Sequence, residues 1–186
     1  MKHYPWQVLA RDSLVNVRPW LQLWRESVQL PSGQVIDDYY TIDMQDYSMV
    51  AAFTPQCLLV VERCYKHGAQ QVTYTLPAGI IEAGESPLLA AQRELLEETG
   101  FSGGTWQPSG TFLVSDTRGC GHAHLFIAQN IEPIADPLNN DLEQIEMILM
   151  TPKQFYQIII EEQRVELSVV TAFSLACWKL GIVLCP

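Results

Sequence analysis

The chain has 186 residues, of which 48% are hydrophobic and 17% charged, and its formal net charge at pH 7 is −10. This balance is typical of a folded globular chain and excludes a disordered one. The acidic charge argues against a duplex nucleic-acid binder, and no apolar run reaches the ~18 residues that would suggest a membrane-spanning helix. Scattered cysteines without a C-x-x-C pair, and a start without a signal-peptide pattern, favour a cytoplasmic protein without a zinc site.

Residues 1–45 predict an N-terminal extension with a hairpin, followed by one domain over 46–186. The runs 21–30 and 35–44 are rich in β-branched and aromatic residues and flank a turn that contains Ser-Gly. This pattern is typical of two strands around a turn. Residues 1–19 show no clear periodicity and predict no element.

Two apolar runs, 48–54 and 57–65, are split by a Pro-Gln pair and predict adjacent antiparallel strands. Because both runs are almost continuously apolar, we expect them to be buried on both faces, as in the central sheet of an α/β/α sandwich. A short strand over 71–76 then leads into the loop Pro77-Ala78-Gly79.

The next segment, LPAGIIEAGESPLLAAQRELLEETGF, carries the strongest signals in the chain. Ser86 and Pro87 have the pattern of an N-cap and a first helical residue, and Gly100 stands where a left-handed residue would end the helix. The spacing predicts a helix of about four turns. The apolar side chains expected to face a core are Leu88, Leu89, Ala91, Leu95 and Leu96.

Glu94, Glu97 and Glu98 stand at positions i, i+3 and i+4, which places their carboxylates on one helix face. Like charges at this spacing repel one another, and packing gives no reason to keep them together. A hard divalent cation supplies the reason, since Mg²⁺, Mn²⁺ and Ca²⁺ prefer carboxylate oxygens. The alternative, and the commoner explanation of a bare E-x-x-E-E run, is a solvated acidic face with an Arg93–Glu97 pair.

The complete frame is far more specific than the acidic run. Gly79, Glu85, Arg93-Glu94-Leu95, Glu97-Glu98 and Gly100-Phe101 resemble the signature of the Nudix hydrolases at every fixed position. The resemblance implies an α/β/α sandwich with a mixed central sheet. It also implies a pyrophosphohydrolase that acts on a nucleoside diphosphate linked to another group, with Mg²⁺, or Mn²⁺ in its place, as cofactor.

The resemblance also assigns roles within the frame. Arg93 and Glu85 would form a supporting pair that orients the helix against its loop, and Arg93 and Glu97 would also serve catalysis. Gly79 would permit a backbone conformation, or a close approach of backbone to metal and phosphate, that a Cβ would obstruct. The implied metal ligands are Glu94, Glu97, Glu98 and the backbone carbonyl of Ala78.

Other segments resemble the Nudix enzymes that cleave ADP-ribose and related nucleotide sugars. In those enzymes an N-terminal hairpin with a P-x-G turn pairs with a second subunit, so the resemblance implies a homodimer. The hairpin's aromatic side chains are either ordinary sheet residues or part of an adenine pocket shared by the dimer, with Tyr40 as the candidate substrate contact. These side chains are Trp20, Trp24, Tyr39 and Tyr40.

The segment Glu62–Gly68 resembles the Q-Y-R segment of the ADP-ribose pyrophosphatases. Cys64 replaces the glutamine and Lys66 replaces the arginine. Lys66 is therefore a candidate phosphate or ribose contact, without the bidentate fork of an arginine.

After the helix, 111–115 and 124–128 predict strands joined by a loop over 116–122. In this loop Arg118 is a candidate phosphate clamp. His122 or His124 either lines the sugar site or is structural, and zinc binding by the two is not expected without a third ligand.

The same loop departs from the ADP-ribose-cleaving relatives, which usually have S-P-G there. Asp116 stands in place of the proline and Thr117 in place of the glycine. The departure weakens the case for ADP-ribose and leaves the chemistry unchanged.

Residues 131–142 predict a loop that ends in DLEQIE, which resembles the family's E-x-I-E sequence before its last strand. There a loop carboxylate completes the site. Glu143 is the first candidate for general base or extra metal ligand and Asp141 the second; the equal alternative is a solvated loop carboxylate. A strand at MILM and helices over about 151–162 and 166–180 are expected to follow.

Three functions remain open. The first is a nucleotide-sugar pyrophosphatase, with ADP-ribose the leading substrate and GDP-mannose, another sugar nucleotide or a dinucleotide behind it. The second is a domain that binds a nucleotide as a sensor without cleaving it, and the third is an interaction module with an incidental acidic helix. The intact set of Arg93, Glu94, Glu97 and Glu98 favours the first.

Overall fold

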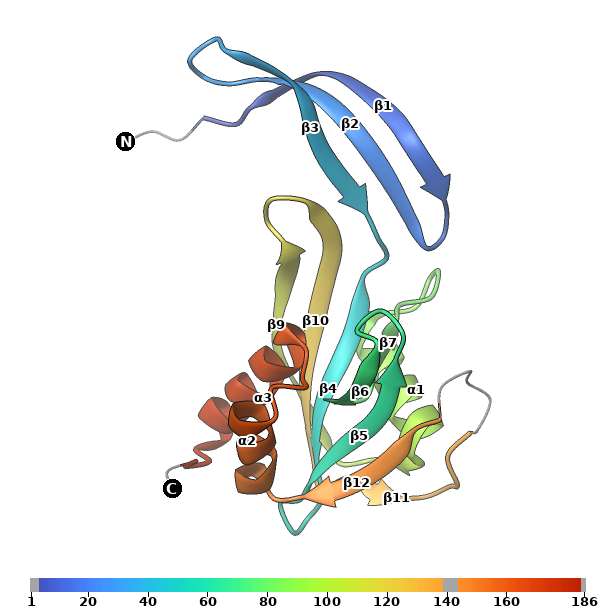
Figure 1. Ribbon diagram of the computed structural model, residues 1–186. Helices are drawn as coiled ribbons and strands as arrows, with labels where there is room; N and C mark the ends of the chain where they lie inside the picture. Colours follow the sequence, from blue (N-terminus) through green and yellow to red (C-terminus); the bar gives the residue numbers. More distant parts are fainter. Residues whose placement is uncertain (1–3, 139–143, 185–186) are drawn as a thin grey trace. The chain divides into compact units, whose positions relative to one another are not determined.

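The computed structural model describes residues 4–138 and 144–184 (Figure 1). Within them the chain is an α/β fold in which ten strands form one mixed sheet, two more form a small pair, and three helices are present. The chain forms two compact units, the first made of Met1–Asp46 and Leu113–His122 and the second of Tyr47–Phe112 and Ala123–Pro186. No helix of the described part is both long and apolar enough to cross a membrane.

The first unit is built on three antiparallel strands, β1 (Gln7–Val17), β2 (Leu21–Gln29) and β3 (Val35–Asp43). The predicted hairpin is confirmed as β2 and β3, and Gly33 adopts a positive φ of 88° in the turn between them. The segment for which the sequence predicted no element forms β1. All of β1 is exposed and its pairing with β2 shifts register twice, so no simple alternation of apolar and polar residues marks it.

The second unit contains the central sheet. β4 runs parallel to β10 and antiparallel to β5, and β5 pairs antiparallel with both β12 and β6. The expected burial of the two apolar runs is confirmed, since most of β4 and β5 is buried. The strands are β4 (Tyr47–Phe53), β5 (Leu59–Lys66), β6 (Gln71–Thr75), β10 (Gly119–Gln129) and β12 (Glu146–Met150).

The strand β9 (Thr105–Ser115) pairs with β10, and β8 (Phe101–Ser102) pairs with β11 (Glu132–Pro133). Three loop predictions were wrong in part, and the first is the loop over 131–142, in which Glu132–Pro133 forms β11. Ala78–Ile80 forms the strand β7, because its backbone pairs antiparallel with β4. The predicted loop over 116–122 is shorter than expected, because β10 already begins at Gly119.

Helices cover both faces of the central sheet, which confirms the expected α/β/α sandwich (Figure 1). One core cluster contains Met49, Ala51 and Phe53 of β4 and packs against α2 and α3, and the other contains Val50 and Ala52 and packs against α1. Alternate residues of one strand therefore serve opposite layers. The helices are α1 (Pro87–Thr99), α2 (Pro152–Glu161) and α3 (Leu167–Leu180).

The helix ends were predicted better than the buried face of α1. Ser86 caps its start and Gly100, with a φ of 74°, ends it, as expected. Ala91 and Leu95 are buried, but Leu88 and Leu89 are 38% and 57% exposed, so the prediction for these two was wrong. The first turn of α1 is fixed by its cap and lies outside the buried stripe, which begins at Ala90.

Candidate functional site

Helix α1 is held in place at its start by hydrogen bonds. The Ser86 side chain accepts a hydrogen bond from the Leu89 amide at 3.3 Å. The hydroxyl of Ser48, a buried residue of β4, donates to the Pro87 carbonyl at 2.7 Å. The helix that carries the acidic side chains therefore begins at a fixed point on the central sheet.

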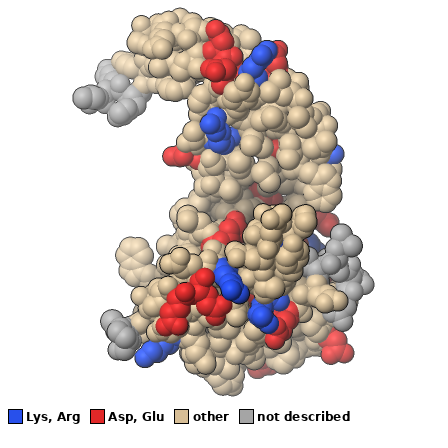
Figure 2. Space-filling model, viewed as in Figure 1, with Lys and Arg blue, Asp and Glu red and all other residues tan. Residues whose placement is uncertain are grey.

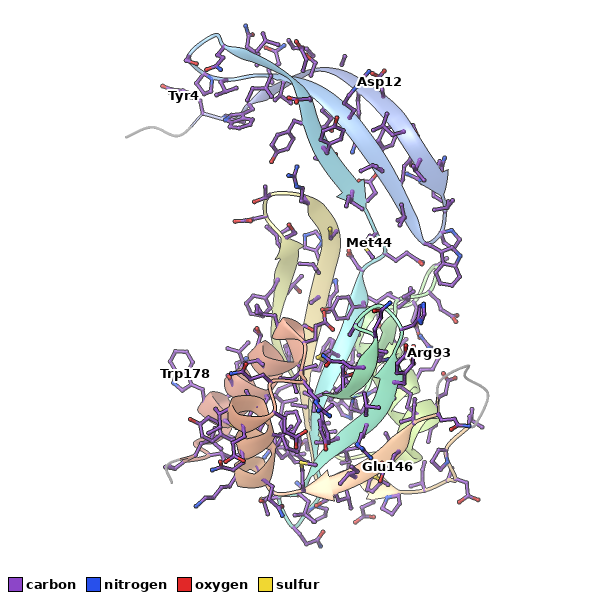
Figure 3. All side chains as sticks on the ribbon, in the orientation of Figure 1. Tyr4, Asp12, Met44, Arg93, Glu146 and Trp178 are labelled. Carbon is purple, nitrogen blue, oxygen red and sulfur yellow. The ribbon has the colours of Figure 1, made fainter. Side chains whose placement is uncertain are left out.

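Arg93 forms most of the side-chain hydrogen bonds described on α1, and its side chain lies beside the segment around β7 (Figure 3). Nε and Nη2 donate to the two carboxylate oxygens of Glu85, each at 3.0 Å, in a bidentate pair. Nη1 donates to Glu94 at 2.6 Å and to Glu97 at 3.2 Å, and Nη2 also reaches the Ile80 carbonyl at 3.1 Å. One guanidinium thus ties the helix to the preceding loop.

These contacts shift the pKa of both partners in the direction of charge. The hydrogen bonds from Arg93, and then that from the Glu82 amide, lower the pKa of Glu85. The hydrogen bond to Glu85 is the largest cause that raises the pKa of Arg93 far above its usual value, against the opposing effect of burial. The expected supporting pair is therefore formed as an ion pair.

Gly79 lies in β7, opposite Ser48 of β4. A Cβ at this position would overlap the carboxyl group of Glu94. Gly79 therefore leaves the space for Glu94 to lie against the strand, and the close approach of its backbone to metal and phosphate stays a prediction.

Glu98 is the helix glutamate that contacts β7 and β5 of the sheet. Its Oε2 accepts a hydrogen bond from the Ala78 amide at 3.1 Å, and its carboxyl group is hydrogen-bonded to that of Glu62 on β5. Burial, followed by the negative charges of Glu62 and Glu94, raises the pKa of Glu98 to about 10, although the Ala78 amide acts in the opposite direction. The sheet side of the site therefore favours a proton, or a cation in its place, on the Glu98 carboxyl group.

Sequence reasoning did not find Glu62 as a site residue. It is only 1% exposed, although it carries a carboxyl group in the middle of a buried strand. The available signal was a glutamate inside the apolar run 57–65.

The donor set fits a hard divalent cation. It offers carboxylate oxygens only, at a place where burial and like charge disfavour ionisation of Glu98, and a cation would relieve both effects. In the described residues no three His, Cys, Asp or Glu side chains are already grouped as a ready metal site, because Glu94 and Glu97 turn toward Arg93. Ala78 contributes its amide to Glu98, and the role of its carbonyl stays a prediction.

The two candidate loop carboxylates, Asp141 and Glu143, lie outside the described residues. Leu138, which precedes them, donates its amide to the Glu97 carbonyl at 2.7 Å. Their proposed role as general base or extra ligand stays a prediction.

Lys66 lies at the end of β5, opposite Gln71 of β6. It shares a strand face with Glu62, and four residues of strand separate the two by about 13 Å. Lys66 also lines a cavity of about 520 Å³ together with residues of β6 and Glu166. Its role as a substrate contact is neither supported nor contradicted by these contacts.

The structure places Tyr40 and Arg118 together in the first unit. Arg118 donates to the Tyr40 carbonyl at 3.0 Å, and its guanidinium lies 5.9 Å from the centroid of the Tyr39 ring. The Tyr39 hydroxyl donates to the Thr117 carbonyl at 2.7 Å. Arg118 thus has a structural contact that the sequence did not suggest, and its use as a phosphate clamp stays a prediction.

The other singled-out residues also have structural partners. The Trp24 indole donates to Asp43 at 2.8 Å, and His122 contacts Asp46 through its amide at 2.8 Å. In the second unit, a ring nitrogen of His124 lies 3.1 Å from the Thr111 hydroxyl. Trp20 is exposed.

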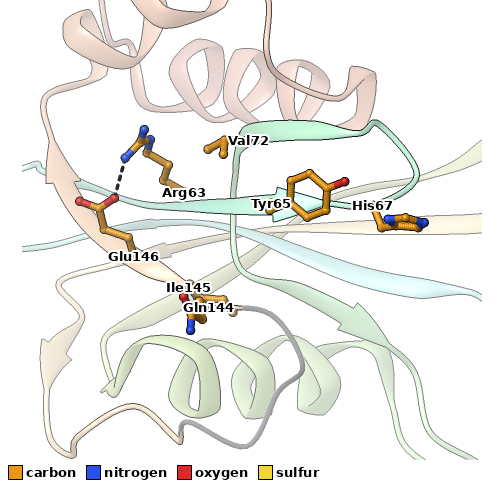
Figure 4. A pocket seen from close by; sticks show the side chains of 7 residues that line it. All are labelled: Arg63, Tyr65, His67, Val72, Gln144, Ile145 and Glu146. Atoms are coloured by element: carbon orange, nitrogen blue, oxygen red, sulfur yellow. Dashed lines mark hydrogen bonds and ion pairs between the residues drawn. The ribbon is translucent and has the colours of Figure 1, made fainter.

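The second unit also contains a cavity of about 730 Å³ that the sequence did not reveal (Figure 4). Arg63 forms an ion pair with Glu146 at 2.9 Å, and the Tyr65 and His67 rings lie 6.2 Å apart between centroids. Arg63 and Tyr65 alternate along β5 with Glu62, so they point to the opposite face of the strand. The remaining lining residues are Val72, Gln144 and Ile145.

The sequence and the fold are similar to those of known proteins. A family model described as NUDIX domain matches residues 46–168. The ADP-ribose pyrophosphatase of Bacillus subtilis (strain 168) is 22% identical over 181 residues, which cover 97% of this chain and 96% of that protein. The ADP-ribose pyrophosphatase of Mycobacterium tuberculosis (strain ATCC 25618 / H37Rv) is 34% identical over 86 residues, which cover 46% of this chain and 41% of that protein. The crystal structure of an ADP compounds hydrolase has the same fold, with a TM-score of 0.85, 18% identity and full coverage of both chains.

Proposed function

Because the chain belongs to the Nudix family and is a pyrophosphohydrolase, we propose that it hydrolyses the diphosphate bond of ADP-ribose to yield AMP and ribose 5-phosphate. The observation that carries the proposal is the contact set of α1, in which Arg93 bonds Glu85, Glu94 and Glu97 while Glu98 lies against β7. The choice of ADP-ribose rests on two relatives that are named ADP-ribose pyrophosphatases.

In this proposal Glu94, Glu97 and Glu98 would hold Mg²⁺, or Mn²⁺ in its place, together with the Ala78 carbonyl. A divalent cation bound there polarises phosphoryl oxygens, lowers the pKa of water and neutralises the charge that shifts to the leaving group. Arg93 keeps the helix carboxylates in position through its fixed pair with Glu85. Asp141 or Glu143 would remove the proton from the attacking water.

Lys66 would contact a phosphate or the ribose of the substrate, since it lies at the end of a strand that also carries Glu62. Arg118 would clamp a phosphate, and Tyr40 would contact the adenine. These assignments can be tested by the Michaelis constant, because loss of a binding contact that is used equally in the ground and transition states raises KM and leaves kcat unchanged.

We also propose that the first unit joins two copies of the chain. Its strand β1 exposes large apolar side chains, among them Val8, Leu9 and Leu14, and most of the surface of this unit seen in Figure 2 is neither acidic nor basic. Sedimentation velocity should give the mass of a dimer. A monomer at micromolar concentration would contradict the proposal.

A second substrate class is favoured by one specific observation. Asp116 and Thr117 stand where ADP-ribose-cleaving relatives have proline and glycine, so GDP-mannose, another nucleotide sugar or a dinucleotide is the alternative substrate. The intact contacts of Arg93 argue against a domain that binds a nucleotide without cleaving it, because such a domain does not need them.

The decisive experiment is a panel of nucleoside diphosphate sugars and dinucleotides assayed with Mg²⁺, with products identified by mass. We expect AMP and ribose 5-phosphate from ADP-ribose, and loss of product in the Glu98→Gln variant. Glu161→Gln, on an exposed position of α2, is the matched control and should retain activity. Tight binding of ADP-ribose without any product would identify a sensor and overturn the proposal.

A further inference from the structure

A buried glutamate on the central sheet lies outside the sequence frame of the catalytic helix. Glu62 is 1% exposed and lies in the middle of β5, where its backbone is paired with Met147 of β12 on one side and with Thr75 of β6 on the other. Val60 and Cys64, which share its face of the strand, are also buried. An apolar side chain would suit this position better than a carboxyl group, whose burial is costly.

The surroundings of Glu62 give a reason for its presence. Its carboxyl group is hydrogen-bonded to that of Glu98, which also accepts a hydrogen bond from the Ala78 amide. Glu98 thus receives one contact from β5 and one from β7. Because helix α1 would otherwise fix Glu98 only through its own backbone, these two contacts decide where the carboxyl group of Glu98 lies.

We propose that Glu62 is a positioning residue of the divalent-cation site, holding the carboxyl group of Glu98 against β7 and adding negative charge from the sheet side. The inference rests on the proposed function, since it assumes that Glu98 is a cation ligand. It adds a residue from a different strand to a site that the sequence frame confines to one helix and the loop before it. Substitution of a residue that hydrogen-bonds a metal ligand commonly lowers metal affinity by about 10- to 100-fold.

The test is a direct measurement of cation binding by the full-length chain. The Glu62→Gln variant keeps the shape and hydrogen-bonding capacity of the side chain and removes its charge. We expect this variant to bind Mn²⁺ at least about 10-fold more weakly than the unsubstituted chain. The electron paramagnetic resonance signal of free Mn²⁺ measures the binding. Without a cation, its melting temperature should equal or exceed that of the unsubstituted chain, because a buried contact between two acidic groups is relieved.

The matched control is Glu26→Gln. Glu26 is also buried, at 8% exposure, but it pairs with Arg11 at 2.9 Å in the first unit. This variant should bind Mn²⁺ with unchanged affinity and should melt at a lower or equal temperature. Glu62→Val, which matches the apolar neighbours on the strand, provides a second variant that removes the carboxyl group and favours folding.

The outcomes separate this inference from the proposed function. If the unsubstituted chain binds Mn²⁺ and both Glu62 variants bind it equally well, Glu62 is merely structural and the inference is overturned while the proposed function stands. If the unsubstituted chain binds no Mn²⁺ and no Mg²⁺, the proposed function itself is overturned. Weaker binding by both Glu62 variants, together with unchanged binding by Glu26→Gln, supports the inference.

Discussion

Helix α1 places its glutamates in two different surroundings. Near Arg93, one guanidinium bonds Glu85, Glu94 and Glu97, and the pKa of Glu85 is lowered as a result. Near Glu98, burial and the charges of Glu62 and Glu94 act together and raise the pKa to about 10. The chain itself balances the charge in the first environment, whereas in the second nothing in the described part of the chain balances an ionised Glu98 carboxylate.

The difference suggests that the two environments of this helix have different roles, one in the geometry of the site and the other in cation binding. The Arg93 environment forms with folding and fixes the geometry of the site, since its contacts all come from the chain. The Glu98 environment is favourable only when positive charge or a proton compensates for its carboxyl groups. Substitutions in the first should therefore act mainly on geometry and stability, and substitutions in the second mainly on cation binding and turnover.

The largest effect is expected from Glu98→Gln. Its turnover of ADP-ribose should fall by about 10³-fold, the upper end of the loss that follows removal of one preorganised electrostatic group. Its melting temperature without Mg²⁺ should not fall, because glutamine has the shape of the protonated carboxyl group that burial favours there. Steady-state kinetics and thermal unfolding by circular dichroism measure both. Turnover near the unsubstituted rate would show that Glu98 is not a ligand.

Gly79→Ala tests the contact between the two environments, because the added Cβ would overlap the Glu94 carboxyl group. A displacement of Glu94 of about 1 Å should lower kcat/KM by about 10²-fold. Gly68→Ala is the matched control, since nothing lies within 4 Å of an added Cβ there. Equal kinetics for the two variants would mean that Glu94 can move without consequence.

Addition of Mg²⁺ should stabilise the fold through the Glu98 environment. At a free concentration of 100 times Kd, a ligand that binds only the folded state adds about 2.7 kcal/mol to the free energy of unfolding. Thermal melts in Mg²⁺ and in EDTA measure the difference, and Glu98→Gln should reduce it. Identical melting curves in the two buffers would count against a cation site.

Arg93→Lys should have the smallest effect on the free energy of unfolding. The lysine keeps the charge and loses the bidentate pair with Glu85, which should cost about 1–2 kcal/mol at this partly buried position. The control is Arg63→Lys, whose pair with Glu146 is largely exposed and should contribute less to the free energy of unfolding. Urea denaturation compares the two, and an equal cost would show that the Arg93 contacts add nothing beyond a surface pair.

The parts of the molecule that the sequence predicted well depend on local interactions. Ser86 and Gly100 cap the two ends of α1 through contacts with residues a few positions away, so their roles follow from the local sequence. The pairing of Arg93 with Glu85 depends on a short loop and a helix turn, and it was expected from the Nudix resemblance and is present in the structure.

The parts that were missed depend on contacts between distant segments. Glu62 and Glu98 meet because α1 packs on the sheet face to which Val60 of β5 also points, and the sequence does not state which strands share that face. The contact of Arg118 with Tyr40 was not predicted, because it arises only when the turn after β9 meets β3. The strand β1 escaped prediction because pattern recognition needs one buried face, and β1 is exposed along its whole length.

Ser48 has a consequence for how related chains can vary in length. It lies opposite Gly79, which makes room for Glu94, and its hydroxyl holds the carbonyl of Pro87, where the helix begins. A single residue of β4 therefore contacts both ends of the connection between β7 and α1. An insertion between residues 81 and 84 would leave both ends in place, but it would change the spacing from Gly79 to Glu85 and disturb the pair of Glu85 with Arg93. The length of this loop is therefore constrained by the site, although the two ends are not held by it.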